Sequence, residues 1–123
     1  MTKLLLIDDD EPFARMLAER LHREGFAVSM AGDGKPGVAL FQQERFPLVI
    51  LDIILPEMEG LETLRELRSL DPDVKVIAIS GGGAGDPGVY LHSAELLGAR
   101  AAFTKPLDWP PFLAKLRELL GEA

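Results

Sequence analysis

The chain has 123 residues, of which 47% are apolar and 27% charged, and a formal net charge of −7. This is the length of one domain that buries about two-thirds of its unfolded surface, and it is too short for a catalytic domain with a separate cap or output domain. The acidic balance argues against direct binding to nucleic acid or to an anionic membrane, since both need a basic face. Cysteine is absent, which excludes disulfides, thiolate metal sites and a cysteine nucleophile. No apolar run reaches the ~20 residues that cross a bilayer, and there is no signal-peptide pattern, so we expect a cytoplasmic protein without membrane insertion.

Short apolar runs alternate along the chain with stretches of helical spacing. The runs predict five strands, over 3–7, 26–31, 48–51, 74–79 and 101–104. The helical stretches predict five helices, over 12–24, around 38–41, over 61–70 and 89–97, and from 108 to 120. Asp10 and Glu11 are interpreted as capping or dipole residues of the first helix, and Asp108 is predicted to cap the last helix. Asp33 is interpreted as a turn residue.

The order of these elements predicts the fold class. Strands that are apolar on both faces are typical of a parallel sheet with helices on each side. The sequence therefore predicts an α/β fold of (βα)5 type, a doubly wound five-stranded parallel sheet, with no internal repeat or linker. In open sheets of this kind, ligands bind outside the carboxyl ends of the strands, where the strand order reverses.

Polar side chains stand at the ends of four predicted strands. In chain order they are Asp8, Asp9, Asp52, Ser80 and Lys105. If these strands are neighbours, three carboxylates, a hydroxyl and an ammonium group converge. Clustered carboxylates repel one another unless a cation joins them, and oxygen ligands without imidazole or thiolate favour Mg²⁺. The set fits phosphoryl transfer onto a carboxylate, in which catalysis is mostly positioning and charge neutralisation.

Four motifs in register carry a resemblance to a known family: LLLIDDDEP, LVILDIILPEMEGLE, VIAIS and FTKP. Through them the whole chain resembles the receiver (CheY-like) domain of two-component response regulators. The resemblance implies a flavodoxin-like strand order 2-1-3-4-5. It also implies one receiver domain over residues 1–123, with no output domain.

The resemblance assigns roles at the acidic cluster. It implies that Asp52 accepts a phosphoryl group from the phosphohistidine of a sensor kinase. Asp9 would bind Mg²⁺ directly and Asp8 mostly through water, with Asp52 in the same ligand set. The main-chain carbonyl of Ile54 would be the third protein ligand.

The resemblance also covers the fourth and fifth strand ends. Ser80 and Lys105 would each bind a phosphoryl oxygen, and the peptide bond between Lys105 and Pro106 is cis in most such domains. One position departs from the family, because Ala102 stands where a Tyr or Phe usually swings inward on phosphorylation. Phe103 should point to the opposite side of the strand, so the aromatic switch cannot operate in its usual form.

The resemblance implies a signalling module, not an enzyme that turns over an external substrate. It would catalyse only its own phosphorylation and dephosphorylation. The partners implied are a sensor histidine kinase or phosphotransfer protein, and an output protein on another chain. Signalling would use a changed surface near the fourth helix and fifth strand, and a homodimer would form through the face of the fourth helix, fifth strand and fifth helix. In relatives, polar side chains at the positions of Ile54 and Gly82 could orient the hydrolytic water. Here the Ile54 side chain is apolar and Gly82 has no side chain, so we expect slow self-dephosphorylation.

Two other functions stay open at this point. A phosphorylation-independent interaction module is motivated by Ala102 and by the glycine-rich loop after Ser80. A hydrolase of the haloacid dehalogenase type would use Asp8 and Asp10 as an Asp-x-Asp pair, but such enzymes need a longer chain and a later acidic pair. The glycines at 81–83 lack the Gly-Lys-Ser/Thr of a nucleotide loop and are interpreted as a flexible loop. The residues interpreted as surface or packing residues are His22, His92, Trp109 and Phe112.

Overall fold

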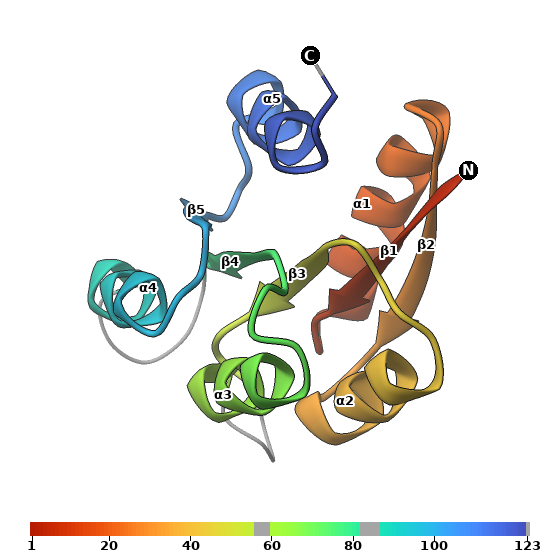
Figure 1. Cartoon of the computed structure of the whole chain (residues 1–123). Helices are drawn as coiled ribbons and strands as arrows, with labels where there is room; N and C mark the ends of the chain where they lie inside the picture. The colour runs from red at the N-terminus through yellow and green to blue at the C-terminus, as the bar shows by residue number, and fades with distance from the viewer. Residues whose placement is uncertain (56–59, 82–86, 123) are drawn as a thin grey trace.

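The computed structural model describes residues 1–55, 60–81 and 87–122, with residues 87–90 described for the backbone alone. Within these ranges five strands alternate with five helices (Figure 1). The strands are β1 (Thr2–Ile7), β2 (Phe26–Ala31), β3 (Val49–Asp52), β4 (Val76–Ser80) and β5 (Ala101–Thr104). The helices are α1 (Glu11–Arg23), α2 (Gly34–Gln43), α3 (Gly60–Leu70), α4 (Pro87–Leu96) and α5 (Trp109–Leu119).

The strands form one parallel sheet in the order β2-β1-β3-β4-β5, which confirms the predicted topology. Ile7 pairs with Leu51 of β3, and Ser80 pairs with Thr104 of β5. The carboxyl ends of β1, β3, β4 and β5 therefore meet at one edge of the sheet. The strand order reverses between β1 and β3, so the residues that follow β1 and those that end β3 share the switch point where ligands bind in such folds.

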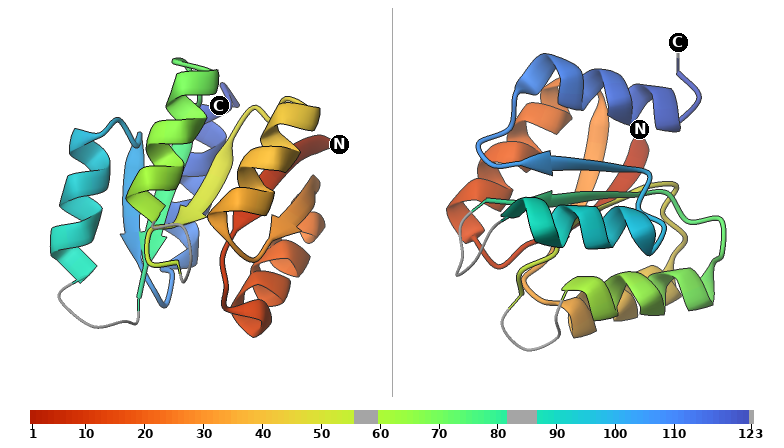
Figure 2. Two further views of the ribbon diagram at one scale, coloured as in Figure 1. Left: turned by 90° about the horizontal axis from the view of Figure 1, so that it is seen from below. Right: turned by 90° about the vertical axis from the view of Figure 1, so that its left-hand side faces the viewer.

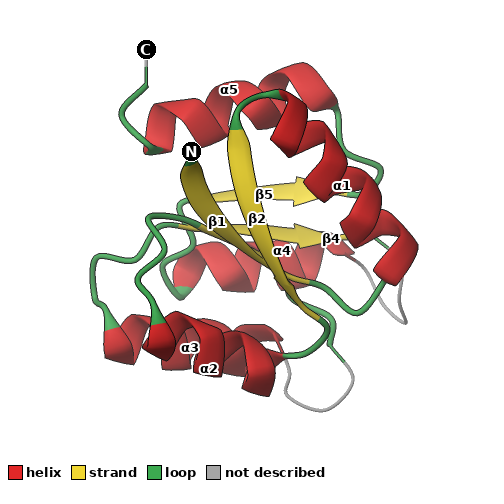
Figure 3. Ribbon diagram, turned by 90° about the vertical axis from the view of Figure 1, so that its right-hand side faces the viewer, coloured by secondary structure: helices red, strands yellow, loops and turns green. Residues whose placement is uncertain are grey.

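Helices cover both faces of the sheet (Figures 2 and 3). Helices α1 and α5 pack on one face, and α2, α3 and α4 pack on the other. Alternate residues of β1 enter the two layers: Leu5 and Ile7 face α2, whereas Leu4 and Leu6 face α1 and α5. All four of these side chains are completely buried. Burial on both faces explains why the run is apolar at every position.

Acidic residues precede three of the helices, with different results. The Asp10 carboxylate accepts a hydrogen bond from the Phe13 N–H at 3.2 Å, which confirms its capping role at α1. Asp33 is the N-cap of α2 and accepts from the Gly34 N–H at 2.7 Å, so α2 begins ahead of the apolar residues that predicted it. Asp108 occupies the N-cap of α5, but its side chain makes no capping hydrogen bond, so the expected cap there is wrong in its chemistry.

The middle residues of β5 point to opposite layers, as predicted. Ala102 packs against the α2, α3 and α4 layer, and Phe103 packs on the α1 and α5 layer. Phe103 meets Phe112 edge to face with ring centroids 5.3 Å apart, and Trp109 stacks on Phe112 at 5.8 Å. These contacts confirm the packing roles assigned to Trp109 and Phe112.

The two histidines lie at the surface, as the sequence predicted. His22 and His92 are both exposed. Among the described residues, no helix is long and apolar enough to span a bilayer.

Helix α3 starts in direct contact with the backbone that leaves β3. The Gly60 N–H donates to the Ile53 carbonyl at 3.2 Å. A Cβ at position 60 would lie 2.1 Å from the Ile53 Cα and would clash with it, so only glycine, which has no Cβ, fits here. Ile53 stands between Asp52 and Ile54, so this close approach fixes the backbone on which the candidate site is built.

We expect Gly60→Ala to lower the free energy of unfolding by about 2–4 kcal/mol, because the backbone at Ile53 must shift to admit the methyl group. Urea unfolding followed by circular dichroism measures the change. Gly32→Ala is the control, since a Cβ there meets nothing within 4 Å, and its effect should stay within about 0.5 kcal/mol. Equal stability of the two variants would contradict the close packing of α3 on β3.

Candidate functional site

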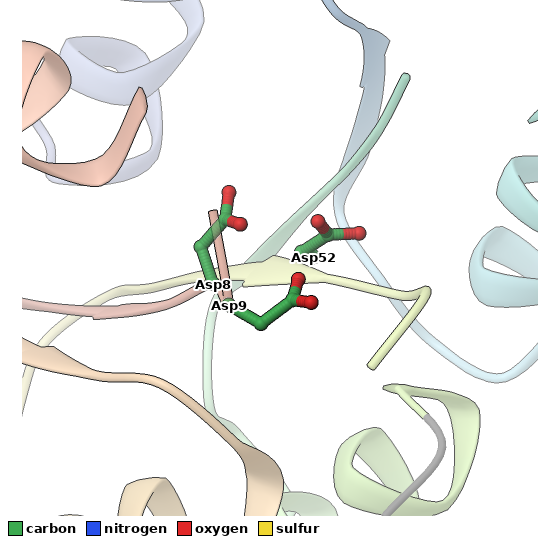
Figure 4. A group of neighbouring side chains, drawn as sticks. All are labelled: Asp8, Asp9 and Asp52. Atoms are coloured by element: carbon green, nitrogen blue, oxygen red, sulfur yellow. The ribbon is translucent and has the colours of Figure 1, made fainter. Parts of the chain in front are cut away.

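Three carboxylates gather at the switch point of the sheet (Figure 4). Asp8 and Asp9 follow β1, and Asp52 is the last residue of β3. One oxygen from each lies within 4.8 Å of the others. Asp8 and Asp52 are buried, with 3% and 5% of their surface exposed, whereas Asp9 is exposed. The structure thus brings together the three acidic residues that the sequence singled out.

The Lys105 ammonium group extends from the end of β5 into this cluster. It donates a hydrogen bond to Asp52 Oδ2 at 3.0 Å. It also lies 2.8 Å from Asp8 Oδ2, as a charge pair without the alignment of a hydrogen bond. Gly81 allows this placement, because a Cβ at position 81 would lie 2.2 Å from the Lys105 Cβ. Lys105 therefore neutralises part of the charge of two carboxylates at once.

Backbone amides orient the other oxygens of the two buried carboxylates. Asp8 Oδ1 accepts from the Asp10 N–H at 2.9 Å, and Asp52 Oδ1 accepts from the Ile54 N–H at 2.9 Å. Each carboxylate is held by a backbone donor two residues ahead, as in an Asx-turn. The side chains are thereby fixed before any ligand enters.

The Ser80 hydroxyl is a buried polar group without a partner among the described residues. Ser80 ends β4 and is completely buried, and its Oγ makes no hydrogen bond within the described parts of the chain. An unsatisfied buried hydroxyl costs roughly 1–3 kcal/mol, so such groups are rare in folded proteins. A hydroxyl left in this state beside Lys105 fits a site that binds an oxygen-bearing ligand.

Asp9, Asp52 and Lys105 border a cavity of about 530 Å³, whereas Asp8 and Ser80 are not among its lining residues. Its lining residues are Asp9, Asp10, Phe13, Asp52, Ile54, Gly81, Lys105 and Pro106. The peptide bond between Lys105 and Pro106 is cis, as predicted. Ala102 and Phe103 are not among the lining residues, because both pack into the core layers. Gly82 and most of the glycine-rich loop after Ser80 lie outside the described residues.

The cavity also reveals a residue that the sequence analysis missed. The Lys105 ammonium lies 4.3 Å from the centroid of the Phe13 ring. Phe13 is one of the apolar residues whose helical spacing predicts the first helix, and that spacing by itself indicates only a packing residue. Its place in the first turn of α1, four residues after Asp9 in the sequence, is the signal that could have indicated a position beside the acidic pair.

Comparison with known proteins decides the family. The model of the response regulator receiver domain family matches residues 4–117. The chain belongs to this family. The match leaves the haloacid dehalogenase alternative without support, and Asp10, the second residue of its Asp-x-Asp pair, caps α1 instead.

Curated relatives are similar over most of this receiver domain. The probable transcriptional regulatory protein TcrX of Mycobacterium tuberculosis is 32% identical over 117 residues, which cover 95% of this chain and 49% of TcrX. Sporulation initiation phosphotransferase F of Bacillus subtilis is 31% identical over 86% of this chain and 83% of its own length. The chain thus spans about half the length of TcrX and most of the length of the second relative.

Solved receiver structures share the fold. A CheY-like receiver domain from Methanospirillum hungatei superposes with a TM-score of 0.85 and 32% identity, over 98% of this chain and 94% of the other. The response regulator TrrA of Thermotoga maritima, solved in complex with Mg(2+)-BeF, gives a TM-score of 0.85 and 28% identity over 97% and 99% of the two chains. These similarities agree with the strand order described above.

The electrostatic balance of the receiver site is uneven. The pKa of Asp8 is raised from 3.8 to about 6; burial is the main cause and the Asp52 charge adds to it, while the contacts with Lys105 and the Asp10 N–H act in the opposite direction. Burial alone would lower the pKa of Lys105, but Asp8 and Asp52 outweigh this effect and raise it. The ammonium thus stays charged, and the carboxylates still hold more charge than it can neutralise. An oxygen-only cluster of this kind is suited to a hard divalent cation.

The raised pKa of Asp8 predicts a pH-dependent loss of stability in the absence of divalent cations. Between pH 3.8 and about 6 the folded state keeps a proton that the unfolded state has released, so the free energy of unfolding falls as the pH rises. We expect the wild type to lose up to about 3 kcal/mol across this window relative to Asp8→Asn, which cannot titrate there. Urea unfolding in a chelator at a series of pH values measures both proteins. Parallel pH profiles would rule out the shift, whatever their constant offset.

Proposed function

We propose that this receiver domain accepts a phosphoryl group on Asp52 from the phosphohistidine of a sensor histidine kinase or phosphotransfer protein. The proposal is carried by one observation: Asp52 lies in a cluster of three carboxylates, 3.0 Å from the Lys105 ammonium. The neighbouring strand β4 ends at Ser80, whose buried hydroxyl has no hydrogen-bond partner among the described residues. The same convergence favours phosphorylation-dependent signalling over a phosphorylation-independent interaction module. A module that only docked a partner would have no use for a buried hydroxyl without a hydrogen bond.

The transfer step needs little from the protein beyond position and charge. A carboxylate oxygen of Asp52 forms a bond to phosphorus, and the bond between phosphorus and the imidazole nitrogen breaks. The nitrogen keeps the electron pair and takes up a proton, so the products are an acyl phosphate and a neutral histidine. Lys105 and Ser80 then bind two of the phosphoryl oxygens, the first as a cation and the second as a hydroxyl donor.

Asp8, Asp9 and Asp52, with the main-chain carbonyl of Ile54, would hold Mg²⁺. The donor set fits this ion, because it contains only oxygen atoms and three of them already lie within 4.8 Å of one another. Asp9 is the exposed member and is assigned direct contact, whereas the buried Asp8 acts mostly through water. When bound, Mg²⁺ would neutralise charge on the transferred phosphoryl group.

The signalling output is proposed to be a change of surface near α4 and β5. Lys105 follows β5 and Ser80 ends β4, and α4 packs on both strands through Leu91 and Ala94. A phosphoryl group at their ends adds charge and acceptor oxygens next to this layer. The partners in this proposal are a kinase or phosphotransfer protein and an output protein on another chain, in the cytoplasm. A homodimer through the α4–β5–α5 face belongs to the same proposal.

We expect the protein to gain the mass of one phosphoryl group when it is incubated with Mg²⁺ and a small phosphodonor such as acetyl phosphate. Asp52→Asn should gain none, because the amide has no oxygen anion to attack phosphorus. Asp108→Asn is the matched control, since Asp108 is exposed and its side chain makes no capping hydrogen bond. Intact-protein mass spectrometry measures all three. No gain in the wild type, or an equal gain in Asp52→Asn, would overturn the proposal.

We further expect slow loss of the phosphoryl group from Asp52. Ile54 borders the cavity with an apolar side chain that cannot orient a water molecule. Ile54→Asn should shorten the half-life of the acyl phosphate several-fold, whereas Ile54→Leu should keep the slow decay. The half-life is followed by mass spectrometry after the donor is removed. An Asn variant that decays at the rate of the Leu variant would contradict this explanation of the lifetime.

A further inference from the structure

The Lys105 ammonium has an aromatic neighbour as well as two anionic ones. It lies 4.3 Å from the centroid of the Phe13 ring, 2.8 Å from Asp8 Oδ2 and 3.0 Å from Asp52 Oδ2. Only 14% of the Lys105 side chain is exposed. A cation over an aromatic face at this distance is attracted by the ring quadrupole, and more strongly when water is largely excluded.

The backbone of Phe13 is tied to the acidic cluster itself. Its N–H donates to the Asp10 carboxylate at 3.2 Å, and the Asp10 N–H donates to Asp8 Oδ1 at 2.9 Å. Two hydrogen bonds therefore connect the residue that carries the ring to the carboxylate that faces the ammonium. The position of the ring is set by the start of α1, whose buried residues Ala14 and Leu17 fix the helix on the sheet.

The three neighbours of the ammonium differ in what else they do, if the proposed function holds. Asp52 gives an oxygen to phosphorus, so its charge is altered in the transfer. Asp8 belongs to the carboxylates assigned to the cation, so its charge is shared. Phe13 has neither task. Its contact with Lys105 is therefore the one of the three that phosphoryl transfer and cation binding leave unchanged.

We propose that Phe13 is a positioning residue that acts through Lys105. Its ring holds the ammonium at the border of the cavity when Asp8 interacts with the cation and Asp52 carries the phosphoryl group. The amine therefore stays directed at the phosphoryl oxygens. This inference rests on the proposed function. The inference adds a residue of α1 to the proposed site. This residue lies outside the four sequence motifs and does not stand at a strand end.

The test uses Mg²⁺ with beryllofluoride as the phosphoryl mimic. Phe13→Leu keeps an apolar side chain of similar size but removes the aromatic face, and Phe13→Tyr keeps that face. We expect Phe13→Leu to weaken beryllofluoride binding by about three- to tenfold, and Phe13→Tyr to stay within about twofold of the wild type. Titration followed by ¹⁹F NMR of the bound mimic gives the affinities, and urea unfolding verifies that each variant is folded.

The chain offers a matched control in a second cation–aromatic pair. The Arg20 guanidinium lies 4.1 Å from the Trp109 ring, so this pair also joins α1 to the segment after β5. Trp109 does not border the cavity. Trp109→Leu should lower stability without changing beryllofluoride affinity. An equal loss of affinity in Trp109→Leu and Phe13→Leu would assign the effect to general packing of α1 and overturn the proposal.

A spectroscopic readout tests the contact directly. An ammonium held over a ring places the neighbouring methylene protons of Lys105 in the ring current, which shifts their NMR signals upfield. We expect this shift in the wild type and in Phe13→Tyr, with and without Mg²⁺ and beryllofluoride, and its loss in Phe13→Leu. A shift that disappears when the mimic binds would show that the ring releases the amine, which contradicts the proposal.

The two proposals can fail separately. A wild type that gains no phosphoryl mass overturns both. A wild type that gains the mass, together with a Phe13→Leu variant that binds beryllofluoride as tightly as the wild type, overturns the role of Phe13 alone. The same conclusion follows if Phe13→Tyr is as weak as Phe13→Leu, because shape and not the aromatic face would then set the affinity.

Discussion

A single ammonium group, that of Lys105, sits between two buried carboxylates at the edge of the sheet, 2.8 Å from one and 3.0 Å from the other. A third carboxylate, Asp9, stands within 4.8 Å of both. Like charges at such separations repel by several kcal/mol at the effective dielectric of a protein surface, and one cation offsets only part of this. The site therefore keeps an excess of negative charge in the folded protein. That excess, together with the raised pKa of Asp8, is the physical reason why the arrangement suits a divalent cation and a phosphoryl group.

The sheet supplies what this charge cluster requires. The clustered groups come from the ends of β1, β3 and β5, far apart in the chain, and the order β2-β1-β3-β4-β5 brings them together. Because both faces of the sheet are covered, the strands themselves must be apolar, and polar chemistry is confined to their ends. Fold and site thus follow from one constraint.

That constraint also explains why the strands and most of the site residues could be predicted from the sequence. Apolar runs located the strands, and Asp8, Asp52 and Lys105, the charged residues directly after three of the predicted strands, are brought together in the structure. The start of α2 was less readable, because Gly34, Lys35 and Pro36 show no apolar spacing and the Asp33 cap alone marks the helix.

Side-chain geometry set the limit of prediction. Asp108 has the right residue type for a cap, but whether its carboxylate reaches a backbone N–H depends on a rotamer that spacing does not encode. The role of Phe13 was hidden for a related reason. Apolar periodicity explains a half-buried ring completely, and only its distance to Lys105 distinguishes packing from a contact with charge.

The departure at Ala102 can be placed in the same terms. Alternation along β5 sends residue 102 into the α2, α3 and α4 layer and residue 103 into the α1 and α5 layer. With alanine at the first position, β5 brings no ring to the α4 side, and its aromatic bulk lies with Phe112 and Trp109 on the other. Phe13, the ring beside Lys105, packs in that same layer. Among the side chains that the structure describes, the rings in contact with Phe103 and with the Lys105 ammonium therefore belong to the α1 and α5 side of the sheet.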